Sequence, residues 1–231
     1  MPGGRSTRLA RLEVCFFSEA LPAKRHPEGS KSIDTSQRAR NMSAIILVAL
    51  VVSGLGAGAA YGAMSDNNFI ADDWQHLEKL TDRAPVEYLM HILDFRQPHY
   101  FYRPLPRFLM YVQHAIFGLH PQGYHLTSLL FHISNGLLWG LFLAVITRCS
   151  LLMPVAALTF AVFPTYADAV LWISDTEVLL ALFFSLVCLL LWTRFLITGS
   201  AVVCAAALGA LLLAFLSKET SVFFVPVLFV L

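Results

Sequence analysis

Two adjacent carboxylates followed by an aromatic ring form the most reactive-looking group in the sequence, at Asp72, Asp73 and Trp74. One carboxylate could accept a proton from an attacking hydroxyl as a general base. Together, the two could bind a hard divalent cation through oxygen ligands. The Trp74 ring could stack on a sugar or lie in a membrane interface. The alternative is structural, since an Asp at this point could cap the short helix that follows. Asp72 and Asp73 are the candidate catalytic residues, with Trp74 as a substrate contact.

Two basic side chains have the chemistry to bind phosphate. Arg103 precedes a proline that can begin a helix, and a guanidinium can bind phosphate through two parallel hydrogen bonds. Pairing with lipid headgroups is the alternative for Arg103. Lys218, with Glu219, interrupts an apolar run of about thirty residues. An unpaired ammonium is costly there, and Glu219 is too near in sequence to face it. A lipid-linked phosphate could be its partner, or Lys218 could extend to the interface from a polar turn.

A second acidic group comes between two apolar segments, around the sequence Trp-Ile-Ser. Asp168, Asp175 and Glu177 could complete a carboxylate cluster with Asp72 or Asp73, or they could mark a hydrated loop. The candidate substrate-binding residues are therefore Trp74, Arg103, Asp168, Asp175, Lys218 and Glu219. The histidines have no metal-binding spacing. A divalent cation at Asp72 and Asp73 stays a hypothesis.

These residues must be positioned by apolar helices. The chain is 57% hydrophobic and only 13% charged, whereas a soluble domain carries about 25% charged residues. Such an excess of apolar surface fits a bilayer better than water. Apolar segments cover residues 43–63, 125–146, 151–163, 178–197, 201–216 and 222–231. About 20 apolar residues suffice to span a bilayer. We predict an all-α, polytopic transmembrane helical bundle of about five or six spans, with a partly helical outer loop after the first span.

The chain divides into a tail and a membrane domain. Residues 1–41 are rich in Lys and Arg and predict a disordered basic tail, and Met42 could be the true start. Residues 43–63 predict an anchor, with a cleaved signal peptide as the alternative. Residues 42–231 form the predicted transmembrane domain. The final apolar segment stops at about ten residues, so we expect a chain truncated at its C-terminus.

The distribution of basic residues predicts which polar segments share one side of the membrane. The tail, Arg148 and Arg194 should be cytoplasmic. Residues 64–124, 165–177 and 218–219 would then lie together on the outer, periplasmic or lumenal side. Within the first of these loops, residues 104–119 have the spacing of an amphipathic helix at the membrane surface. This arrangement would bring the conspicuous acids beyond the tail to one side.

Six short motifs occur in a recognisable order. They are FIADDW at 69–74, YRPL at 102–105, FGLHPQGYHL at 117–126, LLFHISNGLL at 129–138, AVLWIS at 169–174 and LSKET at 216–220. Over about residues 43–231 the chain resembles membrane glycosyltransferases of GT-C architecture. The most similar branch is the protein O-mannosyltransferase type, including members with tetratricopeptide repeats. Asp175-Thr176 follows the Trp-Ile-Ser where relatives commonly have an Arg.

The resemblance implies a fold of many transmembrane helices with a catalytic first outer loop. Such enzymes transfer a sugar from a polyprenyl- or dolichyl-phosphate carrier to a protein or glycan acceptor, with inversion at the anomeric carbon. It further implies that Asp72 or Asp73 is the base or binds the acceptor, and that Arg103 and Lys218 lie near the carrier phosphate. Membrane lipids would surround the protein. Nucleic acid is not an expected partner, because the sequence has no basic stripe interleaved with aromatics.

Two rival interpretations remain. A transporter or channel subunit would place ionisable residues at mid-membrane depth and would show paired, broken helices. A non-catalytic membrane fragment would explain the final short apolar segment. The acids cluster in the predicted outer loops and the sequence shows no internal repeat, which favours an active site at the membrane surface.

Overall fold

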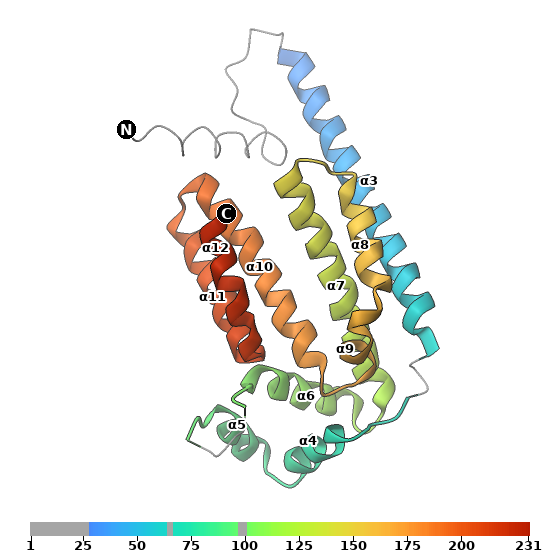
Figure 1. Cartoon of the computed structure of the whole chain (residues 1–231), viewed down its shortest axis with the longest axis vertical. Coiled ribbons are helices and arrows are strands. Elements are labelled where there is room, and N and C mark those ends of the chain that lie inside the picture. Colours follow the sequence, from blue (N-terminus) through green and yellow to red (C-terminus); the bar gives the residue numbers. More distant parts are fainter. Residues whose placement is uncertain (1–27, 64–66, 97–100) are drawn as a thin grey trace.

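The computed structural model describes residues 28–63, 67–96 and 101–231, and within these ranges it is helical without any strand (Figure 1). The predicted all-α class is therefore confirmed for the part of the chain that is described. The elements are α3 Glu28–Tyr61, α4 Asp72–Thr81, α5 Pro85–Leu93, α6 Pro104–Phe117, α7 Pro121–Thr147, α8 Leu152–Val162, η2 Pro164–Tyr166, α9 Ala167–Leu171, α10 Thr176–Thr198, α11 Ala201–Ser217, η3 Glu219–Phe224 and α12 Val225–Val230.

Among the described residues, three helices are long and apolar enough to cross a membrane: the Arg40–Tyr61 part of α3, α7 and α10. A fourth span results if α8 and the following Pro164–Leu171, bent by 53° relative to each other, count as one. α11 and the Glu219–Val230 segment are shorter. The number of qualifying spans is thus below the five or six predicted. The reason is length, because α11 has only 17 residues and the apolar helix after Lys218 covers only Glu219–Val230.

The predicted boundary between tail and membrane domain does not coincide with the start of a helix. α3 begins at Glu28 and continues through Met42 to Tyr61. Residues 28–41, predicted as part of a disordered tail, therefore belong to a helix. The remainder of the predicted tail, residues 1–27, lies outside the described residues.

α7 and α8 touch at the level of their backbones. A Cβ atom on Gly140 would lie 2.5 Å from the Met153 carbonyl oxygen, and one on Gly136 would lie 3.1 Å from the Ala157 carbonyl oxygen. Small residues allow such an approach between apolar helices, where packing drives association. α7 also packs against α3 and α10, so it is the central helix of the array (Figure 1).

A row of buried polar side chains on α7 connects it to its neighbours. Ser128 Oγ lies 2.6 Å from Thr176 Oγ1 on α10, and Asn135 Nδ2 donates to the Leu179 carbonyl at 2.9 Å. On the other side, His132 Nε2 lies 3.0 Å from the Ala161 carbonyl on α8. His132 is thus a buried contact between α7 and α8.

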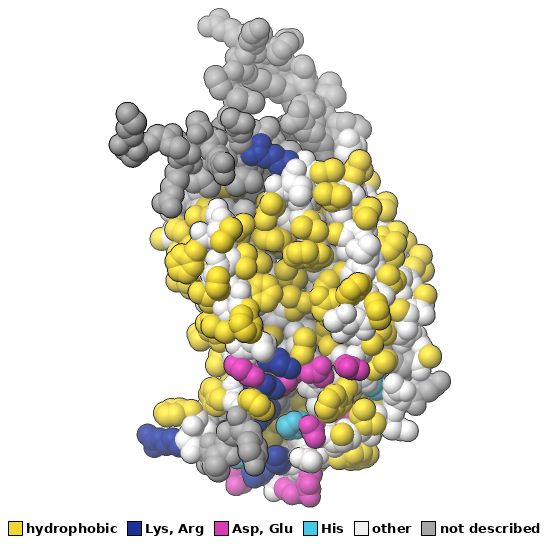
Figure 2. Space-filling view, viewed as in Figure 1, with side chains coloured by type: hydrophobic (Ala, Val, Ile, Leu, Met, Phe, Trp, Pro, Cys, Tyr) yellow, Lys and Arg dark blue, Asp and Glu magenta, His cyan; other side chains and the backbone are white. Residues whose placement is uncertain are grey.

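The short helices α4, α5 and α6 lie at one end of the long helices (Figure 1). Their shared core includes Phe69, Tyr88, Met110, Tyr124 and Ile173. The predicted amphipathic helix exists as α6, which begins at Pro104 and ends before Gly118, whose φ is 58°. Charged side chains collect at this end, below a broad apolar surface (Figure 2). The three polar segments predicted to share one side therefore meet at one end of the helices.

Candidate functional site

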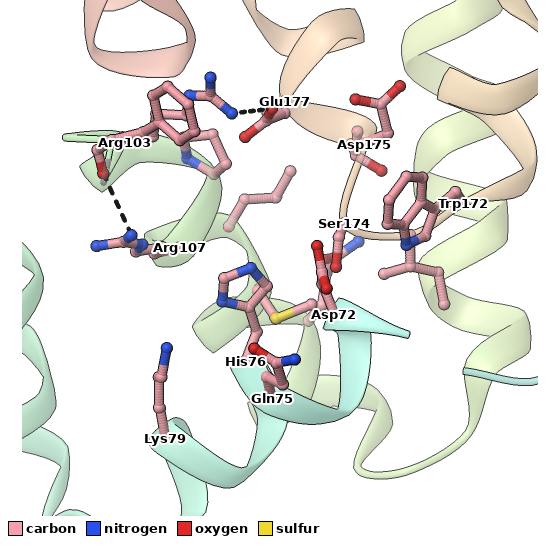
Figure 3. Close-up of a pocket in the computed structure, with 17 residues that line it drawn as sticks. Asp72, Gln75, His76, Lys79, Arg103, Arg107, Trp172, Ser174, Asp175 and Glu177 are labelled. Carbon is pink, nitrogen blue, oxygen red and sulfur yellow. Dashed lines mark hydrogen bonds and ion pairs between the residues drawn. The ribbon is translucent and has the colours of Figure 1, made fainter. Parts of the chain in front are cut away.

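A cavity of about 470 Å³ lies between α4, α6 and the segment that joins α9 to α10 (Figure 3). Cationic or basic side chains come from α4, from Arg103 just before α6 and from α6 itself. Carboxylates come from the first residue of α4, from Asp175 just before α10 and from Glu177 in the first turn of α10. The charged and basic residues that line it are Asp72, His76, Lys79, Arg103, Arg107, Asp175 and Glu177. The cavity therefore combines proton acceptors with groups that bind anions.

One face of α4 forms part of the cavity wall. Asp72, His76 and Lys79 are spaced four and three residues apart, so their side chains project from the same side of the helix. Sequence reasoning selected Asp72 but missed His76 and Lys79 as site residues. The missed signal was this spacing, which predicts a shared face once α4 is recognised as a helix.

Asp73 has a different environment from Asp72. Its side chain is 0% exposed and does not line the cavity. Asp73 Oδ1 accepts a hydrogen bond from the Ser174 amide at 2.7 Å and another from the Ser174 hydroxyl, and Oδ2 accepts one from the Ile70 amide at 3.0 Å. Of the two predicted catalytic acids, only Asp72 is therefore presented to the cavity. Asp73 joins two segments of its wall.

Neither acid takes the helix-capping role that was the structural alternative. The residue preceding α4 is Ala71, and no side chain there caps the helix. Ala71 has φ 45° and ψ −115°, a conformation that an L-residue with a Cβ rarely adopts. Such strain of about 1–3 kcal/mol persists only where surrounding contacts enforce it. Here the hydrogen bonds of Asp73, two residues later, hold the turn that presents Asp72.

Trp74 lies outside the cavity lining. Its Nε1 donates to the Phe69 carbonyl at 3.0 Å, and its ring packs edge-on against the Phe69 ring at 5.3 Å. The side chain is 53% exposed. Asp168 is also exposed and is absent from the lining. These two predicted substrate contacts are therefore not brought to the cavity with the others.

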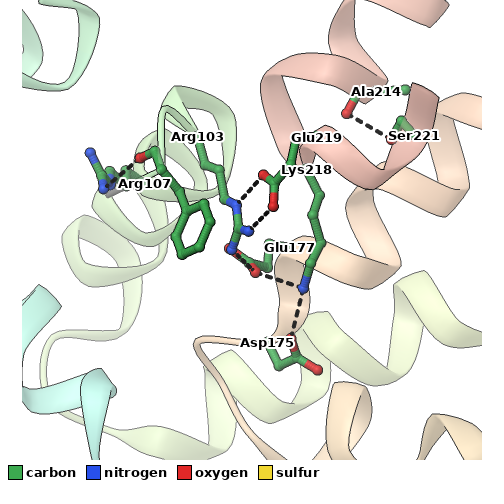
Figure 4. A network of polar contacts seen from close by, with 9 residues as sticks. Arg103, Arg107, Asp175, Glu177, Ala214, Lys218, Glu219 and Ser221 are labelled. Atoms are coloured by element: carbon green, nitrogen blue, oxygen red, sulfur yellow. Dashed lines mark hydrogen bonds and ion pairs between the residues drawn. The ribbon is translucent and has the colours of Figure 1, made fainter. Parts of the chain in front are cut away.

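Arg103 is the centre of an ion-pair network at the edge of the cavity (Figure 4). Its Nε donates to Glu219 Oε2 at 2.8 Å and its Nη2 donates to Glu219 Oε1. On the other side, Nη1 donates to Glu177 Oε1. The guanidinium carbon also lies 4.3 Å from the centre of the Phe101 ring. Arg103 is thus held on three sides.

Lys218 has the partners that the sequence required. Its Nζ lies 2.8 Å from Glu177 Oε1 and 3.3 Å from Asp175 Oδ1 (Figure 4). Glu219 pairs with Arg103 instead, as expected for a neighbour that cannot face Lys218. Lys218 and Glu219 are not part of the cavity lining, but Glu177 joins them to it. The sequence did not predict that Glu177 would bridge both cations.

The hydrogen bonds between Arg103 and Glu219 keep both side chains ionised at neutral pH. Burial alone would lower the pKa of the Arg103 guanidinium, but hydrogen bonds to Glu219 and Glu177 outweigh it and raise the pKa. The hydrogen bond from Arg103 lowers the pKa of the Glu219 carboxyl. Asp175 behaves differently, because burial raises its pKa despite the opposing effect of Lys218.

His76 and Arg107 form the basic side of the cavity. Burial, together with the positive charges of Arg107 and Lys79, lowers the pKa of His76 below its ordinary value of 6.5. The imidazole is therefore neutral at pH 7. Burial also lowers the pKa of Arg107, whose Nη2 donates to the Phe101 carbonyl at 3.3 Å. At neutral pH the fixed positive charges that line the cavity come from Lys79, Arg103 and Arg107.

The sequence matches no protein-family model, no curated protein and no solved structure. The cavity and the sequence motifs are therefore the features of this protein that indicate a function.

Metal binding gains no support from the geometry. Within the described ranges, no group of three or more His, Cys, Asp or Glu side chains lies close enough to hold a metal ion. The hypothesis of a cation at Asp72 and Asp73 also requires free oxygens on Asp73, and those oxygens accept bonds from Ile70 and Ser174. Of the two acids, only Asp72 has its carboxylate in the cavity, where it can contact a ligand.

Proposed function

We propose that the protein is a polytopic membrane glycosyltransferase of the GT-C type. It transfers a sugar from a polyprenyl- or dolichyl-phosphate donor to a hydroxyl of a protein or glycan acceptor on the outer, periplasmic or lumenal face. The observation that carries this proposal is that Asp72 shares one cavity with Arg103 and Arg107. A carboxylate that can take a proton lies in the same space as cations that can offset phosphate charge.

The reaction assigns a role to each side of the cavity. The acceptor hydroxyl oxygen forms a bond to the anomeric carbon while the bond from that carbon to the phosphate oxygen breaks. Asp72 accepts the hydroxyl proton as general base. The departing lipid phosphate retains the electron pair of the broken bond, and Arg103, Arg107 and Lys79 stabilise its negative charge.

The distribution of surface character supports a site at the membrane boundary. Below the apolar surface formed by the long helices, charged side chains gather at the end that contains the cavity (Figure 2). A lipid carrier with its chain among the apolar helices would have its phosphate at that level. The positive-inside rule, applied to the basic residues of the tail, Arg148 and Arg194, favours the outer side for this end.

A transfer assay in membranes tests the proposal. Membranes containing the full chain receive labelled polyprenyl- and dolichyl-phosphate sugars, and transfer or sugar release is measured for the wild type and for Asp72→Asn. We expect Asp72→Asn to lower the rate by about 10²–10⁴-fold at unchanged abundance, the range for loss of a general base. Asp82→Asn, an exposed acid outside the cavity lining, is the matched control. Abundant wild-type protein without transfer across the donor panel would contradict the proposal.

A transporter-like function is the second candidate, because α7 carries buried His132 and Asn135 within its apolar length. Polar residues at that depth are typical of substrate pathways. Solute uptake into proteoliposomes that is lost in His132→Ala and retained in Asp72→Asn would favour the transporter over the transferase.

A further inference from the structure

We propose that Glu219 is a displaceable partner of Arg103 that competes with a ligand phosphate and so sets the affinity of the cavity for anions. The inference rests on the proposed function in that the ligand carries a phosphate. It goes further by assigning control of anion affinity to an acid that does not itself line the cavity. The role follows from geometry, exposure and charge within the Arg103 network.

Glu219 occupies the edge of Arg103 that suits a phosphate. The Nε and Nη2 groups donate in parallel to the two oxygens of Glu219, at 2.8 Å for the first of these bonds. A phosphate offers two oxygens in a similar arrangement, and Arg binds both kinds of group through this edge. Because Arg103 lines the cavity, a phosphate there can reach the same donors.

The exposure of the partners indicates which of them can leave. The Glu219 side chain is 54% exposed, whereas those of Arg103 and Glu177 are each 15% exposed. Water can therefore solvate the Glu219 carboxylate when it leaves Arg103, while Glu177 has no such freedom. An exposed ion pair is also worth little to stability, so its exchange costs little.

The charges of the network make Glu219 the surplus acid. Asp175, Glu177 and Glu219 face two cations, Arg103 and Lys218. Glu177 contacts both cations and Asp175 contacts Lys218, so the buried part of the network stays neutral without Glu219. A singly charged phosphodiester, the form of phosphate in a lipid-linked sugar donor, restores the charge that was present before when it replaces Glu219.

Arg103 keeps its position when Glu219 leaves. Its Nη1 bond to Glu177 and the Phe101 ring beneath the guanidinium do not involve Glu219. Glu219 itself begins η3, directly after Lys218, where the extended backbone (φ −158°, ψ 134°) ends α11. Glu219 can therefore move without disturbing the regular hydrogen bonds of that helix.

A binding experiment tests this role. Purified full-length protein in nanodiscs is titrated at pH 7 with citronellyl phosphate, a short-chain prenyl phosphate, and separately with inorganic phosphate, and the Kd is measured calorimetrically. We expect Glu219→Gln to bind citronellyl phosphate about tenfold more tightly than wild type, since one charge-assisted competing interaction is removed. Arg103→Gln should abolish the binding. Glu87→Gln, the same change at an exposed position on α5, should leave Kd unchanged.

Each outcome has a separate meaning. Equal Kd values for wild type and Glu219→Gln, with binding lost in Arg103→Gln, would overturn the Glu219 inference and leave the phosphate site standing. Absence of binding in every variant would overturn both this inference and the phosphate site of the proposed function. If inorganic phosphate binds as tightly as the prenyl phosphate and tightens equally in Glu219→Gln, the competition is supported but the lipid donor is contradicted. Should Glu219→Gln not fold, Glu219→Asp keeps the charge with a shorter reach, and we expect an intermediate gain.

Discussion

Asp73 holds the backbone of Ser174 through a 2.7 Å hydrogen bond from the Ser174 amide to Oδ1, across 101 positions of sequence. The bond joins the start of α4 to the segment that precedes α10, and both of these segments line the cavity. Asp72, one residue earlier, is presented by the same turn. The two neighbouring acids thus differ in task, and substitution can separate them.

The first prediction concerns these two acids. Asp73→Ala should lower the free energy of unfolding by about 2–4 kcal/mol, because it leaves the amides of Ile70 and Ser174 without their buried acceptor. Asp72→Asn should change stability by less than about 0.5 kcal/mol, since its side chain is exposed. Thermal and denaturant unfolding of purified protein measures both. Equal loss in the two variants would contradict the division of roles.

A second prediction follows from the backbone at Ala71. Its φ of 45° is strained for a residue with a Cβ, whereas glycine adopts such a φ without steric cost. Ala71→Gly should therefore stabilise the protein by about 1 kcal/mol, even though glycine increases the entropy of the unfolded chain. Ala115→Gly is the control, because Ala115 is exposed within α6 and has an ordinary helical conformation, where glycine is unfavourable. There we expect a loss of stability, and a loss at Ala71 as well would show that its turn is not strained.

The third prediction concerns the contact between α7 and α8. Gly140→Ala should destabilise the protein by about 1–3 kcal/mol, because the new Cβ would lie 2.5 Å from the Met153 carbonyl oxygen and the backbones must separate. Gly209→Ala on α11 is the matched control, since no neighbouring atom lies within 4 Å of the position that its Cβ would take. That change should be neutral or favourable by helix propensity. Melting temperatures of the two variants in detergent measure the effect, and an equal melting temperature for both would contradict the close contact between α7 and α8.

The fourth prediction is a pH dependence at Asp175. Burial raises the pKa of this carboxyl above its ordinary value of 3.8, so the folded state holds the proton more tightly than the unfolded state. Its contribution to stability is therefore fully present below pH 3.8 and is lost as the pH rises through the raised value. Asp175→Asn should melt a few degrees above wild type at pH 7 and at the same temperature below pH 3.8.

Asp82→Asn, at an exposed position just after α4 and away from Asp175, serves as the control for the pH experiment. It should melt at the wild-type temperature at pH 7. A lower melting temperature for Asp175→Asn at pH 7 would instead mean that the ion pair with Lys218 outweighs burial.

The helical class could be read from the sequence because apolar runs of sufficient length have few other structures. The amphipathic spacing likewise predicted α6, and Pro104 marked its first residue. The number of spans was harder to predict. Composition alone cannot decide whether a run such as 201–216, followed by Lys218, continues across a bilayer or ends at a polar break.

The site was only partly predictable. Residue type selected Asp72, Arg103 and Asp175, which the fold brings to one cavity. It also selected Trp74 and Asp168, which lie outside the lining. Residue type cannot reveal direction, and a difference of one position along α4 turns Asp73 into the interior while Asp72 faces the cavity. The bridging role of Glu177 depends on contacts between distant segments, which no local pattern encodes.

The Arg103 network also fixes an order of assembly. Arg103 and its last partner, Glu219, are 116 positions apart, and Glu177 lies between them in the chain. During translation Arg103 is therefore synthesised first, Glu177 second, and Lys218 with Glu219 last. Until α10 and α11 have been synthesised, only water and lipid headgroups can solvate the Arg103 guanidinium. The ionic closure of this end is then a late event in biogenesis, and a pause in synthesis after α6 would leave an unneutralised cation at the cavity edge.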